Sequence, residues 1–141
     1  SQALQSALQQ LGVEASFEQL DSTEDRGHAG TYDLSVYAEV TLPTGDPYSY
    51  LMNNFGTDGI QNFGKYSNAE VDELLDQLAM EFDVDKRNEL AAQIDGIVLS
   101  DNSICNIFHL NMYMAMKDTV VGLNQSPVDY YHITYQTCVE E

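Results

Sequence analysis

Side chains that often carry out chemistry occur in this sequence, but without the spacing that catalysis or metal binding requires. The three histidines, His28, His109 and His132, are far apart, and such residues are more often surface or packed imidazoles than ligands. The chain has no Gly-x-Ser-x-Gly elbow, phosphate-binding glycine loop, zinc-type pattern or dinucleotide fingerprint. Carboxylates are so abundant that a pair of them says little about acid–base catalysis. We therefore predict no enzyme activity, no catalytic residue, no metal site and no cofactor.

The sulfur-containing residues leave two alternatives open. Met112, Met114 and Met116 alternate as if on one face of a strand, and thioethers are good ligands for Cu(I). Alternating methionines more often fill an irregular core. Cys105 and Cys138 have neither metal-ligand nor C-x-x-C spacing. Cys105 lies in an apolar pattern and is most simply a buried small residue, although a disulfide between the two cysteines is possible.

The chain is strongly acidic. Its 141 residues include 23 Asp and Glu but only 5 Lys and Arg, for a formal net charge of -18. Such a surface repels phosphate backbones, so we predict no nucleic-acid partner. The acidity indicates either a solvated outer face in a salty or extracellular setting, or attraction of cationic substrates. No apolar run is long enough to span a membrane, and the length predicts a single domain over residues 1–141.

Two consecutive helices are the clearest prediction. Ser67 and Glu70 have capping-box spacing, so the first helix is expected to begin at about Asn68. Its apolar stripe comprises Val71, Leu74, Leu75, Leu78 and Phe82. Asp83 can cap the second helix, whose last turn Gly96 weakens. The inner face of that second helix comprises Leu90, Ile94, Ile97 and Val98.

Two shorter helices are predicted upstream of this pair. Apolar residues from Leu4 to Leu11 recur at helical spacing, and Gly12 is suited to a left-handed cap. Asp46 and Pro47 have the types preferred at the N-cap and the first position of another helix. The inner side of this helix would be Tyr48, Leu51, Met52 and Phe55.

Alternation of apolar and polar residues predicts strands between and after the helices. Tyr32–Thr41 has the strongest alternation, and Val13–Phe17 has the same pattern. Later strands are expected at Ile104–Leu110, which Met112–Met116 could continue, and at Tyr130–Tyr135, whereas 21–30 is a loop and Cys138–Glu141 is frayed. The expected fold class is α/β, with a mixed sheet flanked by helices.

Four segments, in order, carry a family resemblance. They are Tyr32-Asp-Leu-Ser-Val-Tyr, Gly45-Asp-Pro-Tyr-Ser-Tyr-Leu, Gly64-Lys-Tyr-Ser-Asn-Ala-Glu-Val-Asp-Glu-Leu-Leu and Asp83-Val-Asp-Lys-Arg. Together they resemble the extracytoplasmic solute-binding proteins of peptide and nickel ABC importers, the family 5 type. The resemblance covers roughly Tyr32 to Ile107, over half of the chain.

This resemblance implies an architecture and a partner. The chain would be most of the C-terminal lobe of a two-lobed, periplasmic-binding-protein-like fold, with 122–141 a possible return segment toward the other lobe. The parent protein would lie outside the cytoplasmic membrane and carry a secretion or lipid signal on an N-terminal part. It would capture a peptide or similar solute by hinge closure and deliver it to permease subunits.

The solute contacts are expected where the Tyr32–Thr41 strand ends and the next helix begins. Ligands of open α/β sheets gather beyond the carboxyl ends of strands and at helix N-termini. The candidate ligand-binding residues are Tyr37, Glu39, Val40, Thr41, Pro43 and Asp46. The alternative is that Tyr37 and Glu39 merely cover a sheet face.

The sequence departs from two patterns that the resemblance implies. Several peptide-binding members have an acidic residue three positions before the helix-capping acid, where this chain has Pro43, so Glu39 or Asp46 would have to replace it. Nickel-chelate-binding members use a histidine in the loop after this helix, and Phe55-Gly-Thr-Asp-Gly has none. Binding of a peptide, binding of a metal chelate and a non-transport acidic interaction domain therefore remain alternatives.

Overall fold

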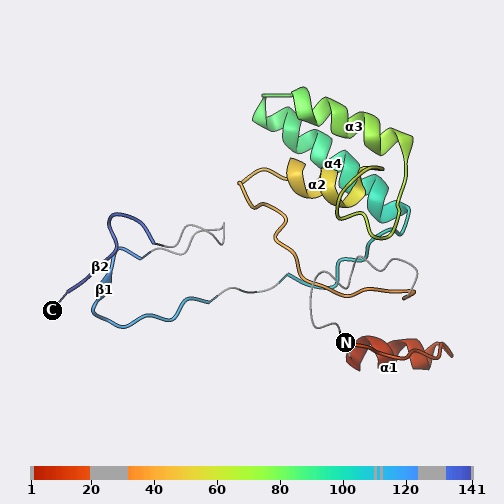
Figure 1. Ribbon diagram of the computed structural model, residues 1–141, viewed down its shortest axis with the longest axis horizontal. Coiled ribbons are helices and arrows are strands. Elements are labelled where there is room, and N and C mark those ends of the chain that lie inside the picture. The colour runs from red at the N-terminus through yellow and green to blue at the C-terminus, as the bar shows by residue number, and fades with distance from the viewer. Residues whose placement is uncertain (1, 20–31, 110, 112, 124–132, 141) are drawn as a thin grey trace. The chain divides into compact units, whose positions relative to one another are not determined.

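The computed structural model describes residues 2–19, 32–109, 111, 113–123 and 133–140. It divides into two compact units, Ser1–Glu39 and Val40–Glu141. The described part of the chain is helix-rich, with one two-stranded sheet (Figure 1). Its elements are α1 (Gln2–Gln10), α2 (Tyr48–Phe55), α3 (Ala69–Met80), α4 (Val84–Ser100), β1 (Val120–Val121) and β2 (Cys138–Val139).

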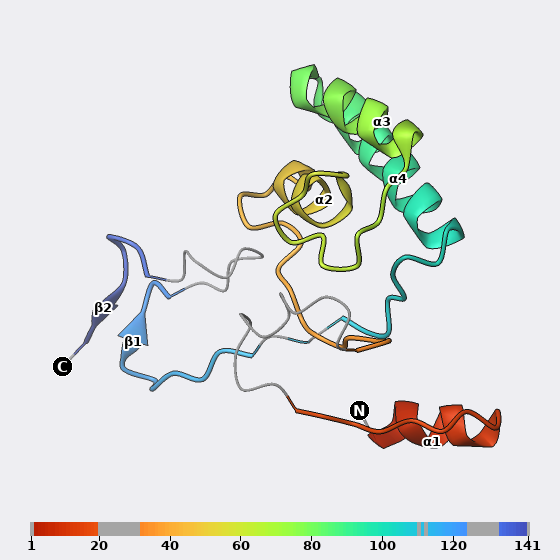
Figure 2. The same ribbon diagram turned by 45° about the vertical axis from the view of Figure 1, so that its right-hand side comes forward.

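The core lies where α2 packs against the antiparallel pair of α3 and α4, whose ribbons run side by side in both views (Figure 2). Each helix turns its predicted apolar face inward. The buried apolar side chains are Leu51, Phe55, Val71, Leu74, Leu75, Leu78, Ile94 and Val98. Four further predicted inner residues are partly buried against this cluster: Tyr48, Met52, Leu90 and Ile97. Helical spacing therefore predicted the contacting faces of all three helices.

For one residue of the predicted apolar stripe of α3, Phe82, the prediction of burial is wrong. Phe82 is 89% exposed, because α3 ends at Met80 and Phe82 lies in the turn that follows. Leu78 and Phe82 are four residues apart, a spacing that puts two side chains on the same face if the backbone between them is helical. The turn before Asp83 breaks that register and directs the Phe82 ring away from the core.

The caps of α3 and α4 follow the sequence with one change. Asn68, not Ser67, caps α3, since its side chain accepts hydrogen bonds from the backbone N–H groups of Glu70 and Val71. Asp83 caps α4 as predicted and accepts a hydrogen bond from the Lys86 N–H at 3.1 Å. The α4 helix continues through Gly96 to Ser100, since packing of its other face stabilises the last turn.

In the first unit, α1 ends as predicted. Gly12 follows it with φ +78, a left-handed conformation that favours glycine. Its amide donates to the carbonyl of Gln9 at 3.0 Å, and the Gln5 side chain donates to the carbonyl of Ala15 at 2.8 Å. No residue of α1 is buried, so these hydrogen bonds rather than a core define the local structure.

The prediction of a larger mixed sheet is wrong for the described residues. Val13–Phe17, Tyr32–Thr41 and Ile104–His109 are not strands, and neither are the described residues of 112–116 and 130–135. Apolar side chains of the alternating segments are exposed: Phe17 by 55%, Leu34 by 67% and Ile107 by 57%. Alternation selects a face for burial but does not supply the neighbouring strand whose hydrogen bonds make a sheet.

The observed sheet is small. β1 and β2 are antiparallel, with Val120 opposite Val139 and Val121 opposite Cys138. The expectation that Cys138–Glu141 is frayed is therefore wrong for Cys138 and Val139. Gly122 follows β1 with φ +71, and a Cβ there would collide with the Gln136 carbonyl. Glycine is therefore required where the chain leaves this strand.

The cysteines and methionines differ from what the sequence predicted. Cys105 and Cys138 are both free and exposed, so Cys105 is not the buried residue expected. Met114 is half-buried and Met116 is 53% exposed, which does not fit a common methionine core. Met112, His28, His132 and the loop 21–30 lie outside the described residues. Within the described ranges, no helix has the length and apolarity needed to cross a membrane.

The core can be tested with two alanine substitutions on neighbouring turns. Leu78→Ala removes a fully buried side chain and should lower the free energy of unfolding by about 3 kcal/mol. Phe82→Ala is the matched control and should change it by about 0.5 kcal/mol or less, since the ring is exposed. Urea denaturation monitored by circular dichroism measures both. Equal losses for the two variants would show that Phe82 is part of the core.

Candidate functional site

The predicted binding segment leads directly into α2. In the first unit, Tyr37 is 43% exposed and Glu39 is half-buried. In the second unit, Val40 and Thr41 are exposed and Pro43 is half-buried. Each of these side chains thus retains surface that solvent can reach. The sixth predicted residue, Asp46, has a different environment.

A tight turn precedes Asp46. The Gly45 amide donates to the Leu42 carbonyl at 3.1 Å, which closes a four-residue turn with Pro43 at its second position. Gly45 itself has φ +80, a conformation in which a side chain is strained. The turn therefore depends on the preset φ of Pro43 and the freedom of Gly45, and it directs the chain into α2.

Asp46 supports the start of α2 with one carboxylate oxygen. Its Oδ1 accepts a hydrogen bond from the Tyr48 N–H at 2.9 Å. Pro47 has helical backbone angles, and its carbonyl accepts the Leu51 amide at 3.0 Å. The prediction is wrong by one position, because Pro47 rather than Asp46 occupies the N-cap of α2, while the Asp46 carboxylate just before it still accepts a hydrogen bond from the first turn.

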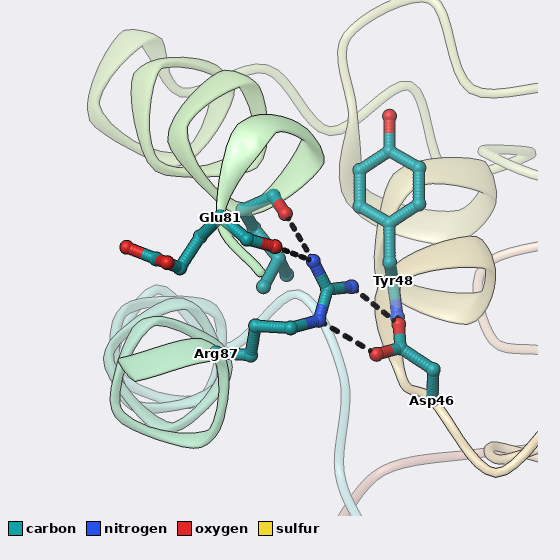
Figure 3. Close-up of polar contacts among 5 residues, drawn as sticks. Asp46, Tyr48, Glu81 and Arg87 are labelled. Carbon is teal, nitrogen blue, oxygen red and sulfur yellow. Dashed lines mark hydrogen bonds and ion pairs between the residues drawn. The ribbon is translucent and has the colours of Figure 1, made fainter. Parts of the chain in front are cut away.

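Arg87 of α4 binds the same carboxylate. Its Nε donates to Asp46 Oδ2 at 2.8 Å and its Nη2 donates to Oδ1 at 2.7 Å, a bidentate pair. Its Nη1 donates to the carbonyl oxygens of Leu78 and Glu81, both at 2.6 Å. Figure 3 shows the guanidinium between Asp46 and the end of α3. We call these four hydrogen bonds the Arg87 clamp. One side chain thus joins the start of α2, the end of α3 and the first turn of α4.

The Arg87 clamp fixes the ionisation of its two charged groups. Hydrogen bonds from Arg87 lower the pKa of Asp46, and the Tyr48 N–H lowers it further, against the opposing effect of burial. The hydrogen bond with Asp46 raises the pKa of Arg87. Both groups are therefore charged at neutral pH. Oδ1 accepts hydrogen bonds from Tyr48 and Arg87 and Oδ2 accepts one from Arg87, so most of the hydrogen-bonding capacity of this carboxylate is used within the chain.

A second polar cluster joins the other ends of α3 and α4. Asp101 follows α4, and its Oδ2 accepts hydrogen bonds from the Tyr66 hydroxyl at 2.6 Å and the Asn68 side chain at 2.8 Å. Burial and the hydrogen bond to Asp101 raise the pKa of Tyr66 to about 12. The hydrogen bond from Tyr66 lowers the pKa of Asp101. The negative charge lies beside the N-cap of α3, where the helix dipole favours it, and directly after the C-terminus of α4, where the dipole opposes it.

The loop between α2 and α3 is held by two further side chains. Asn62 accepts the Tyr66 amide at 2.8 Å and donates to the carbonyls of Gly56 and Tyr66 at 3.0 and 2.7 Å. Asp72 of α3 accepts the amide and the hydroxyl of Thr57 at 2.9 and 2.6 Å. These residues therefore position the loop on the helices.

The described residues contain no group of three or more His, Cys, Asp or Glu side chains that could hold a metal ion. Two shallow depressions mark the described surface. One is lined by Gln9, Glu14, Ala15 and Ser16, and the other by Glu70, Ala92, Gln93, Gly96, Ile97, Ser100 and Asp101. Neither includes any of the six predicted binding residues.

Sequence reasoning thus brought Asp46 into the candidate set but missed its partner. Arg87 was visible only as part of the Asp83-Val-Asp-Lys-Arg segment, and it lies 41 residues from Asp46 in the chain. The signal that could have found it was the scarcity of Lys and Arg, five in the whole chain, which makes each of them a candidate partner for an acid at a helix start.

Comparison with known proteins gives a consistent set of relatives. The chain is 30% identical to the nickel-binding protein NikA of Staphylococcus aureus over 151 residues, 99% of this chain and 29% of that protein. It is 34% identical to a dipeptide-binding protein of Pseudomonas aeruginosa over 104 residues, 72% of this chain and 19% of that protein. It is 30% identical to the probable D,D-dipeptide-binding periplasmic protein DdpA of Escherichia coli over 133 residues, 89% and 25% respectively.

This chain therefore spans less than a third of the length of each of these relatives. No family model and no solved structure matches it.

The Arg87 clamp can be tested by a double-mutant cycle. Arg87→Ala should lower the free energy of unfolding by about 2 kcal/mol, because it leaves two helix carbonyls and a carboxylate without their donor. Asp46→Ala should cost less, and the double variant should fall short of the sum by about 1 kcal/mol, since the pair is partly exposed. Urea denaturation of the four proteins measures this coupling. Strictly additive losses would mean that Asp46 and Arg87 do not interact.

Burial of Tyr66 and its hydrogen bond to Asp101 raise its pKa and so make the stability of the fold depend on pH in the alkaline range. The folded pKa of Tyr66, about 12, exceeds its ordinary value of 10.0, so its contribution is complete below pH 10 and lost as pH rises toward 12. Tyr66→Phe should therefore be less stable than wild type at pH 8, and the difference should shrink between pH 10 and 12. Denaturation at a series of pH values measures it. A difference that stays constant over this range would contradict the assignment.

Proposed function

This chain belongs to the extracytoplasmic solute-binding proteins of peptide and nickel ABC importers, the family 5 type, and we propose that it is part of the component that captures the solute for such an importer. That component would bind a peptide or similar small solute outside the cytoplasmic membrane and deliver it to permease subunits. The observation that carries the proposal is a relationship over 99% of the chain to one such binding protein and over 72% and 89% to two others.

We propose further that these residues form most of the C-terminal lobe of a two-lobed protein, with 122–141 leading toward the other lobe. The chain covers 29%, 19% and 25% of the three relatives, which supports only its being one part of a longer protein. A membrane anchor, where present, would lie on an N-terminal part of the protein. The relatives are binding proteins and not enzymes, which supports a role in binding without catalysis.

The solute class has two candidates. Two of the three relatives above are named for dipeptides, which favours a peptide. The relative matched over the largest share of the chain is named for nickel, which supports a metal chelate as the second candidate. The loop Phe55-Gly-Thr-Asp-Gly offers no histidine to such a chelate, so we place the peptide first.

The proposed solute contacts are Tyr37, Glu39, Val40, Thr41 and Pro43, with Asp46 in a supporting role. The accessibility of Tyr37, Val40 and Thr41 supports this assignment. Asp46 uses both carboxylate oxygens on Arg87, so Glu39 is the acid in this set that we assign to the amino group of a peptide. A charge-assisted hydrogen bond of that kind is the usual anchor for an ammonium group.

Binding would proceed by closure of two lobes on the solute. Closure is favoured only by the contacts that the solute makes with both lobes at once. If one lobe supplies half of those contacts, it should bind weakly by itself. The 141-residue chain alone is therefore expected to give little or no heat with peptides, and micromolar affinity would contradict the lobe assignment.

The proposed contacts can be tested by calorimetry on the protein in its longest natural form, titrated with di- to pentapeptides and separately with a nickel–histidine chelate. Thr41→Ala should weaken peptide binding by about fivefold to tenfold through loss of one hydrogen bond, with no change in melting temperature. Thr44→Ala is the matched control, an exposed threonine in the adjacent turn, and should bind like wild type.

Heat with the chelate alone would favour the metal-chelate candidate. Absence of heat with both solutes, or equal effects of the two threonine substitutions, would contradict the proposed function or the proposed site, respectively.

A further inference from the structure

Three apolar side chains are exposed at alternate positions where α3 ends and α4 begins. Met80 is 75% exposed, Phe82 is 89% exposed and Val84 is 69% exposed. We call these three residues the turn patch. They belong to the same packed unit as the α2–α4 core but contribute nothing to its interior. An exposed aromatic ring gains free energy when a partner covers it, so the turn patch is a candidate contact surface.

The backbone of this turn is fixed. The Glu81 carboxylate accepts hydrogen bonds from the amides of Phe82 and Asp83, both at 2.8 Å. The Asp83 carboxylate accepts the Lys86 amide at 3.1 Å. Arg87 donates to the Glu81 carbonyl at 2.6 Å (Figure 3). Phe82 is therefore presented outward on a backbone held at both ends, and its exposure does not arise from an unstructured loop.

Such a residue is suited to binding a protein. Aromatic residues and methionine are enriched at the cores of protein interfaces, where a few side chains supply most of the binding energy. A backbone that is already ordered loses little entropy when it binds, which strengthens association. The turn patch combines these residue types with an ordered backbone, since Met80 and Phe82 lie on either side of the hydrogen-bonded Glu81.

The charge around the turn patch indicates what the partner carries. Glu81, Asp83 and Asp85 alternate with the apolar residues, and 73–89 holds six acidic and two basic residues. One of the basic residues, Arg87, is paired with Asp46. A partner would therefore gain from lysine and arginine around an apolar pocket. A second copy of this chain, at a net charge of -18, or an anionic lipid surface would be repelled.

We propose that the turn patch is a docking surface for a protein with an apolar pocket rimmed by basic residues. Phe82 is the anchor that enters the pocket, and the carboxylates of Asp83 and Asp85 pair with the rim. The Arg87 clamp and the Glu81 side chain position the anchor. This proposal does not depend on which solute the protein binds, and it concerns none of the residues assigned to solute contact.

The test uses a defined probe for this chemistry. A fluorescein-labelled amphipathic helical peptide, with leucine on one face and lysine on the other, is titrated into the protein and followed by fluorescence anisotropy. Its twin has glutamate in place of every lysine. We expect the lysine peptide to bind, the glutamate twin not to bind, and affinity for the lysine peptide to fall as salt is raised.

Phe82→Ser should weaken binding of the lysine peptide by at least about tenfold. Its melting temperature should remain that of wild type, since the ring is exposed. Ile60→Ser is the matched control, because Ile60 is 80% exposed but lies in the α2–α3 loop, and it should bind like wild type. Binding unchanged by Phe82→Ser, or reduced equally by both substitutions, would overturn the proposal, as would equal binding of the two peptides.

Two further measurements exclude other occupants. Sedimentation equilibrium should show a monomer, and a dimer lost on Phe82→Ser would identify a second copy of the chain and overturn the proposal. Hydroxyl-radical footprinting of the protein in its longest natural form should show oxidation of Phe82. Full protection there would mean that the same polypeptide covers the turn patch, which would also overturn the proposal.

Discussion

The arrangement of the three packed helices depends on one guanidinium group. Arg87 neutralises the acid that begins α2 and supplies donors to carbonyls at the end of α3, while its own backbone lies in α4. Apolar burial holds the helices together but is not directional, whereas the planar fork of arginine matches a carboxylate and nearby carbonyls in one orientation only. The Arg87 clamp therefore determines how the Asp-Pro turn enters the helical core. In doing so it also fixes the end of the segment to which we assign solute contacts.

The residues that make this chain resemble a transport family are therefore mostly structural. Asp46 and Arg87 form the clamp, Asn68 caps α3, and Asp83 caps α4. Tyr66 binds Asp101 at the opposite ends of the helices. A motif shared by proteins that bind peptides and nickel is expected to have this character, since the scaffold is common to them and the solute is not. We propose that the segment Tyr37–Pro43 contributes to solute specificity.

The sequence predicted helices well because a helix contains its own backbone hydrogen bonds. The spacing of Val71, Leu74, Leu75 and Leu78 was sufficient to identify the buried face of α3. A strand needs a neighbouring strand for its backbone hydrogen bonds, and the alternation in Tyr32–Thr41 does not identify that neighbour. The predicted sheet is not found among the described residues. The prediction that Phe82 is buried was wrong because it depended on where α3 ends, and apolar spacing does not define that boundary. The pairing of Asp46 with Arg87 is a tertiary contact between distant positions, which periodicity cannot detect.

The residues that build the scaffold differ from the residues that we propose contact the solute, and one spectrum tests this separation directly. In the protein's longest natural form, nitrogen–proton correlation spectra would follow the Arg87 side-chain Nε–H and the backbone amides during titration with a dipeptide. We expect the amides of Tyr37, Glu39, Val40 and Thr41 to shift, while the Arg87 Nε–H keeps the position it has without peptide. A shift of the Arg87 signal with no change at Tyr37–Thr41 would contradict the account, because it would make the Arg87 clamp itself the solute site.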